Sequence, residues 1–136
     1  MIEENEIKKE YLRSYEKSVR QMERSELKIR EMRLNKMCPS VINDGMPHGS
    51  AQGDLSGYAA LMDKEERKYA ESRCQVEKIY AEIGDKIEQL ENENEKDILT
   101  YRYIHLMKWE DICGKTGYSW QHTHRIHARA LKNFKM

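Results

Sequence analysis

Apolar residues recur at alternating steps of three and four positions along the first part of the chain. Between Ile7 and Met37 there is no Gly or Pro, and most of the other positions are Lys, Arg or Glu. The recurring apolar positions are Leu12, Tyr15, Val19, Met22 and Ile29, with Glu26 as an interruption. This spacing predicts one long amphipathic helix over residues 1–37 with a narrow apolar seam. A helix with so narrow a seam is not stable by itself, so it needs a partner helix to pack against.

The stretch "CPSVINDGMPHGSAQGDLSG", residues 38–57, contains both prolines and four of the seven glycines. It has turn-forming pairs and no apolar periodicity, so it is predicted to be a loop. A three-four seam then returns over residues 58–93, at Met62, Tyr69, Val76, Ile79, Ile83 and Leu90. Two long charged helices with matching seams indicate either an antiparallel hairpin or an intermolecular coiled coil. The spacing does not decide between them.

Residues 97–136 have a different organisation, with three short helical patterns separated by polar turns. The first follows "ILTYRYIHLM", the second follows "WEDICGK", and the third begins after Ser119, a residue type favoured as a helix N-cap. The expected core positions of this module are Ile98, Leu99, Tyr103, Ile112, Tyr118, Ile126, Leu131 and Phe134. The predicted fold is therefore all-α, with two long helices followed by a three-helix helix-turn-helix module.

Formal charge is zero overall but is distributed unevenly. Residues 1–37 carry 10 Lys/Arg against 8 Asp/Glu, residues 38–97 carry 7 against 14, and residues 98–136 carry 7 against 2. A basic C-terminal segment on an acidic helical remainder favours a polyanionic partner for that segment. No run approaches the roughly 18 apolar residues that span a bilayer, and the polar start does not resemble a signal peptide, so we expect a cytoplasmic protein without a membrane partner.

Three of the five histidines lie within six positions, at 122, 124 and 127. His122 and His124 lie about 200° apart on a helix and cannot share a metal ion. The helix offers no Asp, Glu or Cys to complete a metal site with His124 and His127, and no carboxylate or nucleophile for catalysis. The three cysteines lack a CxxC pair, which indicates buried free thiols. We expect neither metal, cofactor nor enzymatic activity.

The polar face of the third helix is instead suited to nucleic acid. Gln121, His122 and Arg125 are expected to reach base edges. Trp120 is expected to pack against sugar or a thymine methyl group, with His124 on the same face. Phosphates are expected to meet Ser119, Arg129 and Lys132. The helix-turn-helix arrangement consists of a short helix, a turn and a second helix that enters the groove. The short helix, the Gly-containing turn and the third helix with its polar face match this arrangement.

These residues resemble region 4 of sigma-70-type transcription factors. The similarity covers "DILTYRYI" with its Arg102–Tyr103 pair, "WEDICGKTGYS", and "SWQHTHRIHARAL" with Ser119 as cap and Ile126 as core. The whole chain is also similar to small phage and prophage regulators of the RinA/ArpU-like type. The resemblance implies a regulator of transcription initiation that binds duplex DNA, without the sigma region that melts promoters. Trp120 and the histidines depart from the usual sigma surface, so base preferences do not carry over.

Other functions also fit the sequence. The chain is alternatively a coiled-coil adaptor whose C-terminal module binds RNA polymerase or a phage protein, or a small terminase-like DNA-packaging protein. The adaptor would use the acidic second helix as the surface that binds the other protein. For the DNA-binding reading we expect a homodimer through the long helices, because one small module buries little surface on DNA.

Overall fold

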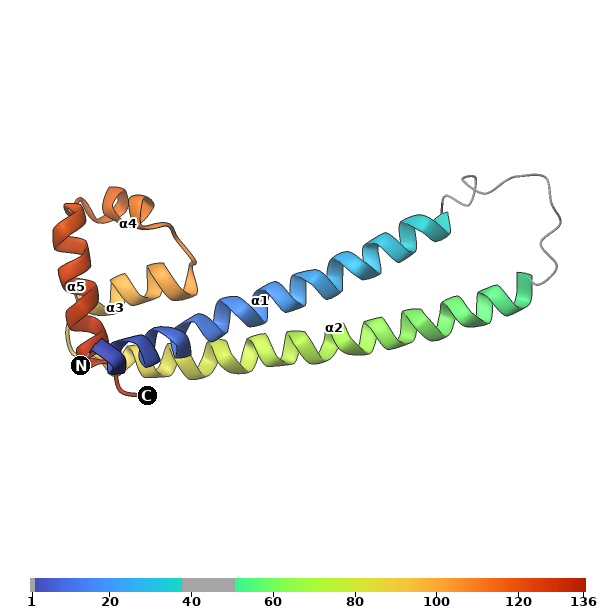
Figure 1. Cartoon of the computed structure of the whole chain (residues 1–136), viewed down its shortest axis with the longest axis horizontal. Helices are drawn as coiled ribbons and strands as arrows, with labels where there is room; N and C mark the ends of the chain where they lie inside the picture. Colours follow the sequence, from blue (N-terminus) through green and yellow to red (C-terminus); the bar gives the residue numbers. More distant parts are fainter. Residues whose placement is uncertain (1, 38–50) are drawn as a thin grey trace. The chain divides into compact units, whose positions relative to one another are not determined.

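The computed structural model describes residues 2–37 and 51–136, with side chains for residues 3–35 and 57–136. The described elements are α1 (Ile2–Met37), α2 (Ala51–Glu88), α3 (Glu93–Leu99), the π-helical turn η2 (Thr100–Ile104), α4 (Trp109–Thr116) and α5 (Trp120–Asn133). Figure 1 labels the five α-helices. No strand occurs in these ranges, which confirms the all-α prediction. The chain divides into unit 1 (Met1–Ser18 with Gln75–Met136) and unit 2 (Val19–Cys74), and both α1 and α2 contribute to each unit.

The seams of α1 and α2 face each other within the chain, so the two helices form an antiparallel hairpin. In unit 1, Leu12 is fully buried with Ile83 and Ile87, and Tyr15 packs against this group. In unit 2, Ile29 is buried, and ion pairs join the helices at Lys28–Glu65 (3.0 Å) and Arg33–Glu66 (3.3 Å). Of the two arrangements that the sequence left open, the structure has the hairpin.

Two glutamates at seam positions in unit 2 differ in how far they are exposed to solvent. Glu26, the expected interruption, is exposed and pairs with Arg30 at 3.3 Å. Glu65, by contrast, is only 4% exposed on the seam face of α2. Its hydrogen-bonded partner Lys28, with help from Lys68, holds the pKa of the Glu65 carboxyl below its ordinary value. The charge therefore stays on the seam because cations from both helices reach it.

The helix boundaries around the two connections differ from the sequence prediction. Helix α2 begins at Ala51, inside the stretch expected to be a loop, and ends at Glu88 rather than near residue 93. The rest of that expected loop, residues 38–50, lies outside the described residues. After α2, the Asn92 side chain accepts hydrogen bonds from the Asn94 and Glu95 N–H groups and begins α3 five residues before Ile98. The polar residues that follow α2 thus form the N-cap and first turn of a helix.

The C-terminal helices of unit 1 share their core with the base of the hairpin. One buried cluster combines Leu12 of α1, Ile83 and Ile87 of α2, and Leu131 and Phe134 at the end of the chain. A second cluster is internal to the helix-turn-helix and consists of Ile98, Ile112 and Ile126. The predicted core residues are buried as expected, except that Tyr118 is half-buried. Residues 97–136, predicted as a domain of their own, therefore form one compact unit with parts of α1 and α2.

Candidate nucleic-acid interface

The turn between α4 and α5 has the geometry that its sequence predicts. Helix α4 ends at Thr116 and is capped by Gly117, whose φ of 76° lies in the left-handed region and whose N–H donates to the Cys113 carbonyl at 2.9 Å. Two residues later, the Ser119 Oγ accepts a hydrogen bond from the His122 N–H at 3.1 Å and caps α5. Glycine tolerates the left-handed conformation and serine satisfies a free N–H group, so this short turn fixes where α5 starts.

A lysine from α1 holds the other end of α5, and no pattern in the sequence predicts this contact. Lys8 is buried, and its Nζ donates to the Leu131 carbonyl at 2.9 Å and to the Lys132 carbonyl at 3.3 Å. Glu4 lies 3.3 Å from the same Nζ. The last carbonyls of a helix lack partners within the helix and carry partial negative charge, so the ammonium stabilises the C-terminus of α5. Figure 1 shows the start of α1 beside this end of α5.

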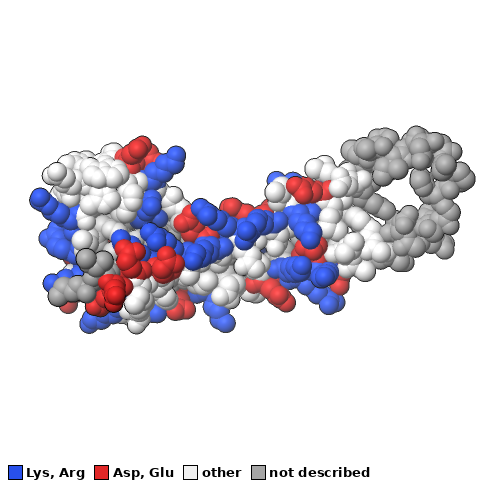
Figure 2. Space-filling view, viewed as in Figure 1, with Lys and Arg blue, Asp and Glu red and all other residues white. Residues whose placement is uncertain are grey.

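Helix α5 has one buried face and one exposed face. Thr123, Ile126, His127, Ala130 and Leu131 are buried. The opposite face carries a stripe of exposed residues that lie within about 60° of one another on the helix: Gln121, Arg125, Ala128 and Lys132. His122 and Arg129 are exposed along one side of this stripe. Figure 2 shows Lys and Arg side chains along the edge of the molecule formed by α5. The structure thus brings most of the predicted DNA-binding residues together on one face.

His124 flanks the opposite side of that stripe from His122 and Arg129 but does not share their exposure, although the sequence placed it with the DNA-binding residues. Its ring is half-buried between two indoles, with centroid distances of 4.5 Å to Trp109 and 4.6 Å to Trp120. Its Nε2 is the one buried side-chain nitrogen or oxygen without a hydrogen-bond partner among the described residues. Trp120 remains 53% exposed. The main contacts of His124 are therefore with other aromatic rings of the module.

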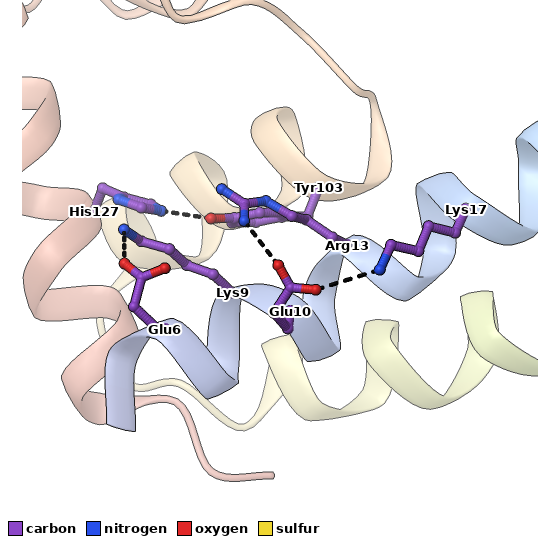
Figure 3. Close-up of polar contacts among 7 residues, drawn as sticks. All are labelled: Glu6, Lys9, Glu10, Arg13, Lys17, Tyr103 and His127. Atoms are coloured by element: carbon purple, nitrogen blue, oxygen red, sulfur yellow. Dashed lines mark hydrogen bonds and ion pairs between the residues drawn. The ribbon is translucent and has the colours of Figure 1, made fainter. Parts of the chain in front are cut away.

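His127 is buried behind α5 and is bound to Tyr103. The Tyr103 hydroxyl and the His127 Nε2 are 2.8 Å apart, and the rings stack at 5.8 Å between centroids (Figure 3). Burial, with smaller contributions from the nearby Lys9, His124, Arg102 and Arg13, lowers the pKa of His127 to about 3. Burial also raises the pKa of Tyr103 to about 12. Both groups are uncharged at neutral pH, so this histidine acts in packing.

The Arg102–Tyr103 pair that carries the sigma resemblance has a structural role here. The Arg102 Nη1 donates to the Met107 carbonyl at 3.0 Å, and its guanidinium lies 4.7 Å from the centre of the Trp109 ring. The backbone around it is unusual, because η2 is a π-helical turn and Leu106 has a φ of 57°. These contacts hold the start of α4 against the preceding turn.

A hollow of about 480 Å³ adjoins the basic side of α5. Ala128, Arg129 and Lys132 line it from α5, and Glu4 and Asn5 line it from α1. The first turn of α1 therefore borders the part of the interface assigned to phosphate. Sequence reasoning missed this contribution, because no pattern links residue 5 to residue 129.

Within the described ranges, no group of three or more His, Cys, Asp or Glu side chains is arranged to hold a metal ion. Cys74 is exposed and Cys113 is half-buried, so the prediction of buried thiols is wrong for Cys74, and Cys38 lies outside the described residues. None of the described helices combines the length and apolar character needed to cross a bilayer.

Comparison with protein-family models, curated proteins and solved structures finds no match. The sigma and RinA/ArpU-like resemblances therefore stay predictions.

Proposed function

We propose that the protein is a sequence-specific transcriptional regulator that places α5 in the major groove of duplex DNA. The observation that carries the proposal is the exposed stripe of α5, Gln121, Arg125, Ala128 and Lys132, with His122 and Arg129 beside it. Helix α5 carries no acidic residue. A capped turn fixes its first residue and Lys8 fixes its last turn. A rigid helix with donors and cations on one face suits groove binding.

The geometry divides the proposed contacts into two groups. Gln121, His122 and Arg125 lie in the N-terminal half of α5, which in helix-turn-helix proteins reaches base edges. Arg129 and Lys132 lie further along and would contact phosphates, together with the N–H groups near Ser119. Trp120 is exposed enough to pack against a sugar or a thymine methyl group. We assign no DNA contact to His124, because two indole rings cover it.

The setting that we propose is a bacterial cytoplasm, with the protein encoded by a phage or prophage and acting as a dimer. The basic segment at residues 98–136, with 7 Lys/Arg against 2 Asp/Glu, supports a nucleic-acid partner over an adaptor role. An adaptor that binds RNA polymerase would use the same module without reading base edges. The two functions differ in how binding depends on DNA sequence and on salt.

The test is fluorescence anisotropy against duplexes tiled from the DNA that flanks its own gene. We expect binding to concentrate on one duplex at about 200 mM salt, and nonspecific binding to weaken steeply between about 50 and 200 mM. Arg125→Ala is expected to cost about 1–3 kcal/mol and to relax specificity, whereas Arg129→Ala weakens all duplexes alike. Arg67→Ala, which removes a charge from unit 2, is the control and leaves affinity unchanged. Equal binding to every duplex, or none at either salt, would contradict the proposal and favour the adaptor.

A further inference from the structure

Two long side chains on the exposed stripe of α5 are available to bond a partner. Gln121 and Arg125 are both exposed, and they lie within about 40° of each other around the helix. Neither side chain has a hydrogen bond or an ion pair with another described residue. By contrast, the exposed Arg13 of α1 is paired with Glu10 at 3.1 Å. Binding through Gln121 and Arg125 therefore breaks no polar contact among the described residues.

The aromatic side chains that flank Gln121 are held by contacts within the module. The His122 ring meets the Tyr118 ring edge-on, with centroids 4.8 Å apart. On the other flank, the Trp120 ring lies 4.6 Å from the His124 ring between centroids. Gln121 lies between these two groups around the helix and remains exposed. The rings thus border the start of the stripe without covering the amide of Gln121.

The two side chains present different hydrogen-bonding groups. The Gln121 amide offers an acceptor beside its donors, whereas the Arg125 guanidinium offers donors only. In the major groove, adenine presents the N7 acceptor beside its N6 amino donor, and guanine presents two acceptors, N7 and O6. Gln121 therefore matches adenine and Arg125 matches guanine. The exchanged pairing is poor, because a guanidinium donor would face the amino group of adenine.

The separation of the two side chains along α5 sets the separation of the two bases. From Gln121 to Arg125 the helix rises about 6 Å, and each base pair rises about 3.4 Å, so the bases lie about two steps apart when α5 lies along the groove. Ala128, the next residue of the stripe, offers no donor or acceptor from its side chain. The hydrogen-bonded contact of the stripe with bases therefore ends at Arg125.

We propose that α5 recognises an adenine and a guanine about two base steps apart, with the Gln121 amide on the adenine and the Arg125 guanidinium on the guanine. This inference rests on the proposed function, because it names the DNA that the same helix face binds. It assigns no base to Arg129 or Lys132, whose charges contact phosphates of any sequence.

The test is selection of duplexes by the full chain from a library with a randomised core, followed by anisotropy with the enriched duplex. We expect the enriched sequence to contain the adenine and the guanine at this separation. Changing the adenine to guanine, or the guanine to adenine, with the matching change in the other strand, should weaken binding of the wild-type chain by about tenfold or more.

Exchange variants separate base recognition from a general loss of affinity. Arg125→Gln should bind best when adenine replaces the guanine, and Gln121→Arg should bind best when guanine replaces the adenine. Both positions are exposed, so neither exchange disturbs the core. Arg129→Gln is the matched control, because it removes a charge from the same helix. This control should weaken binding to every duplex alike and keep the wild-type base preference.

The outcomes separate this inference from the proposed function. A library that enriches no sequence removes both. An enriched sequence without the adenine and guanine at this separation overturns the inference and leaves the proposed function in place. An exchange variant that keeps the wild-type preference overturns the assignment of that side chain. Preferences that follow the exchanged side chains, with an unchanged preference in Arg129→Gln, support the inference.

Discussion

Tyr103 and His127 share a buried hydrogen bond of 2.8 Å on the side of α5 that faces away from the proposed DNA contact. Lys9 and Arg13 of α1 lie beside this pair, as Figure 3 shows, and their positive charges oppose protonation of the imidazole. The uncharged Tyr103–His127 pair packs against the buried side of α5 and helps to hold the helix in place. It also links the stability of unit 1 to pH.

We predict that the free energy of unfolding falls as pH is lowered from about 6.5 toward 3. The pKa of His127 is about 3 in the folded chain and 6.5 ordinarily, so the unfolded chain binds more protons in this window. Urea unfolding between pH 7 and 5, above the range of most carboxylates, isolates the effect. His127→Gln should reduce the slope by up to about 1.4 kcal/mol per pH unit, whereas Tyr103→Phe keeps it. Equal slopes for wild type and His127→Gln would refute the assignment.

We predict that Lys8→Met lowers the free energy of unfolding by about 2 kcal/mol. The substitution keeps the apolar stem but removes a charged donor from two carbonyls at the end of α5. Chemical denaturation measures the change. Lys17→Met, at an exposed lysine of the same helix, should stay within about 0.5 kcal/mol of wild type. Similar values for the two variants would mean that Lys8 contributes no special stabilisation.

Two glycines three positions apart should respond oppositely to alanine. Gly117 has a left-handed φ of 76°, so Gly117→Ala should destabilise the chain by about 1–2 kcal/mol. Gly114 lies within α4 with open space around a built Cβ, so Gly114→Ala should stabilise it by about 0.5–1 kcal/mol. Thermal unfolding compares them directly. Changes of the same sign would show that backbone conformation does not control this turn.

The two neighbouring histidines of α5 should differ in their effect on DNA binding. His124→Phe keeps the ring between Trp109 and Trp120 and removes an unpaired buried nitrogen, so affinity should stay within about twofold. His122→Phe removes an exposed polar group and should weaken specific binding by about tenfold. Anisotropy with the preferred duplex measures both. A larger loss for His124→Phe would return that residue to the DNA contact.

Periodicity alone predicted much of the fold. The seams of α1 and α2, the Ser119 cap and the short helix at Trp109 follow from local spacing, which needs no knowledge of distant contacts. The exposed stripe of α5 was also foreseeable, because Gln121, Arg125 and Lys132 recur on one helical face. These features depend on residues that are close together in the sequence, so the sequence alone predicts them.

The features that were missed depend on contacts between distant segments. Lys8 and Glu65 look like ordinary solvated charges until other helices supply their partners. His124 and His127 look like part of a polar face until Trp109 and Tyr103 pack against them. Tertiary surroundings decide the role of such residues, so sequence spacing could not assign it.

The Lys8–Leu131 contact joins residues 123 positions apart, and this separation bears on how the protein is made. During synthesis, α1 leaves the ribosome long before α5 exists, and Leu12 has no α5 to cover it until Leu131 and Phe134 emerge. Closing so distant a contact is slow compared with forming local helices. Helix α5 is therefore expected to take its final form last, and a nascent chain arrested before residue 131 would expose an apolar surface to chaperones and proteases instead of the proposed surface for DNA.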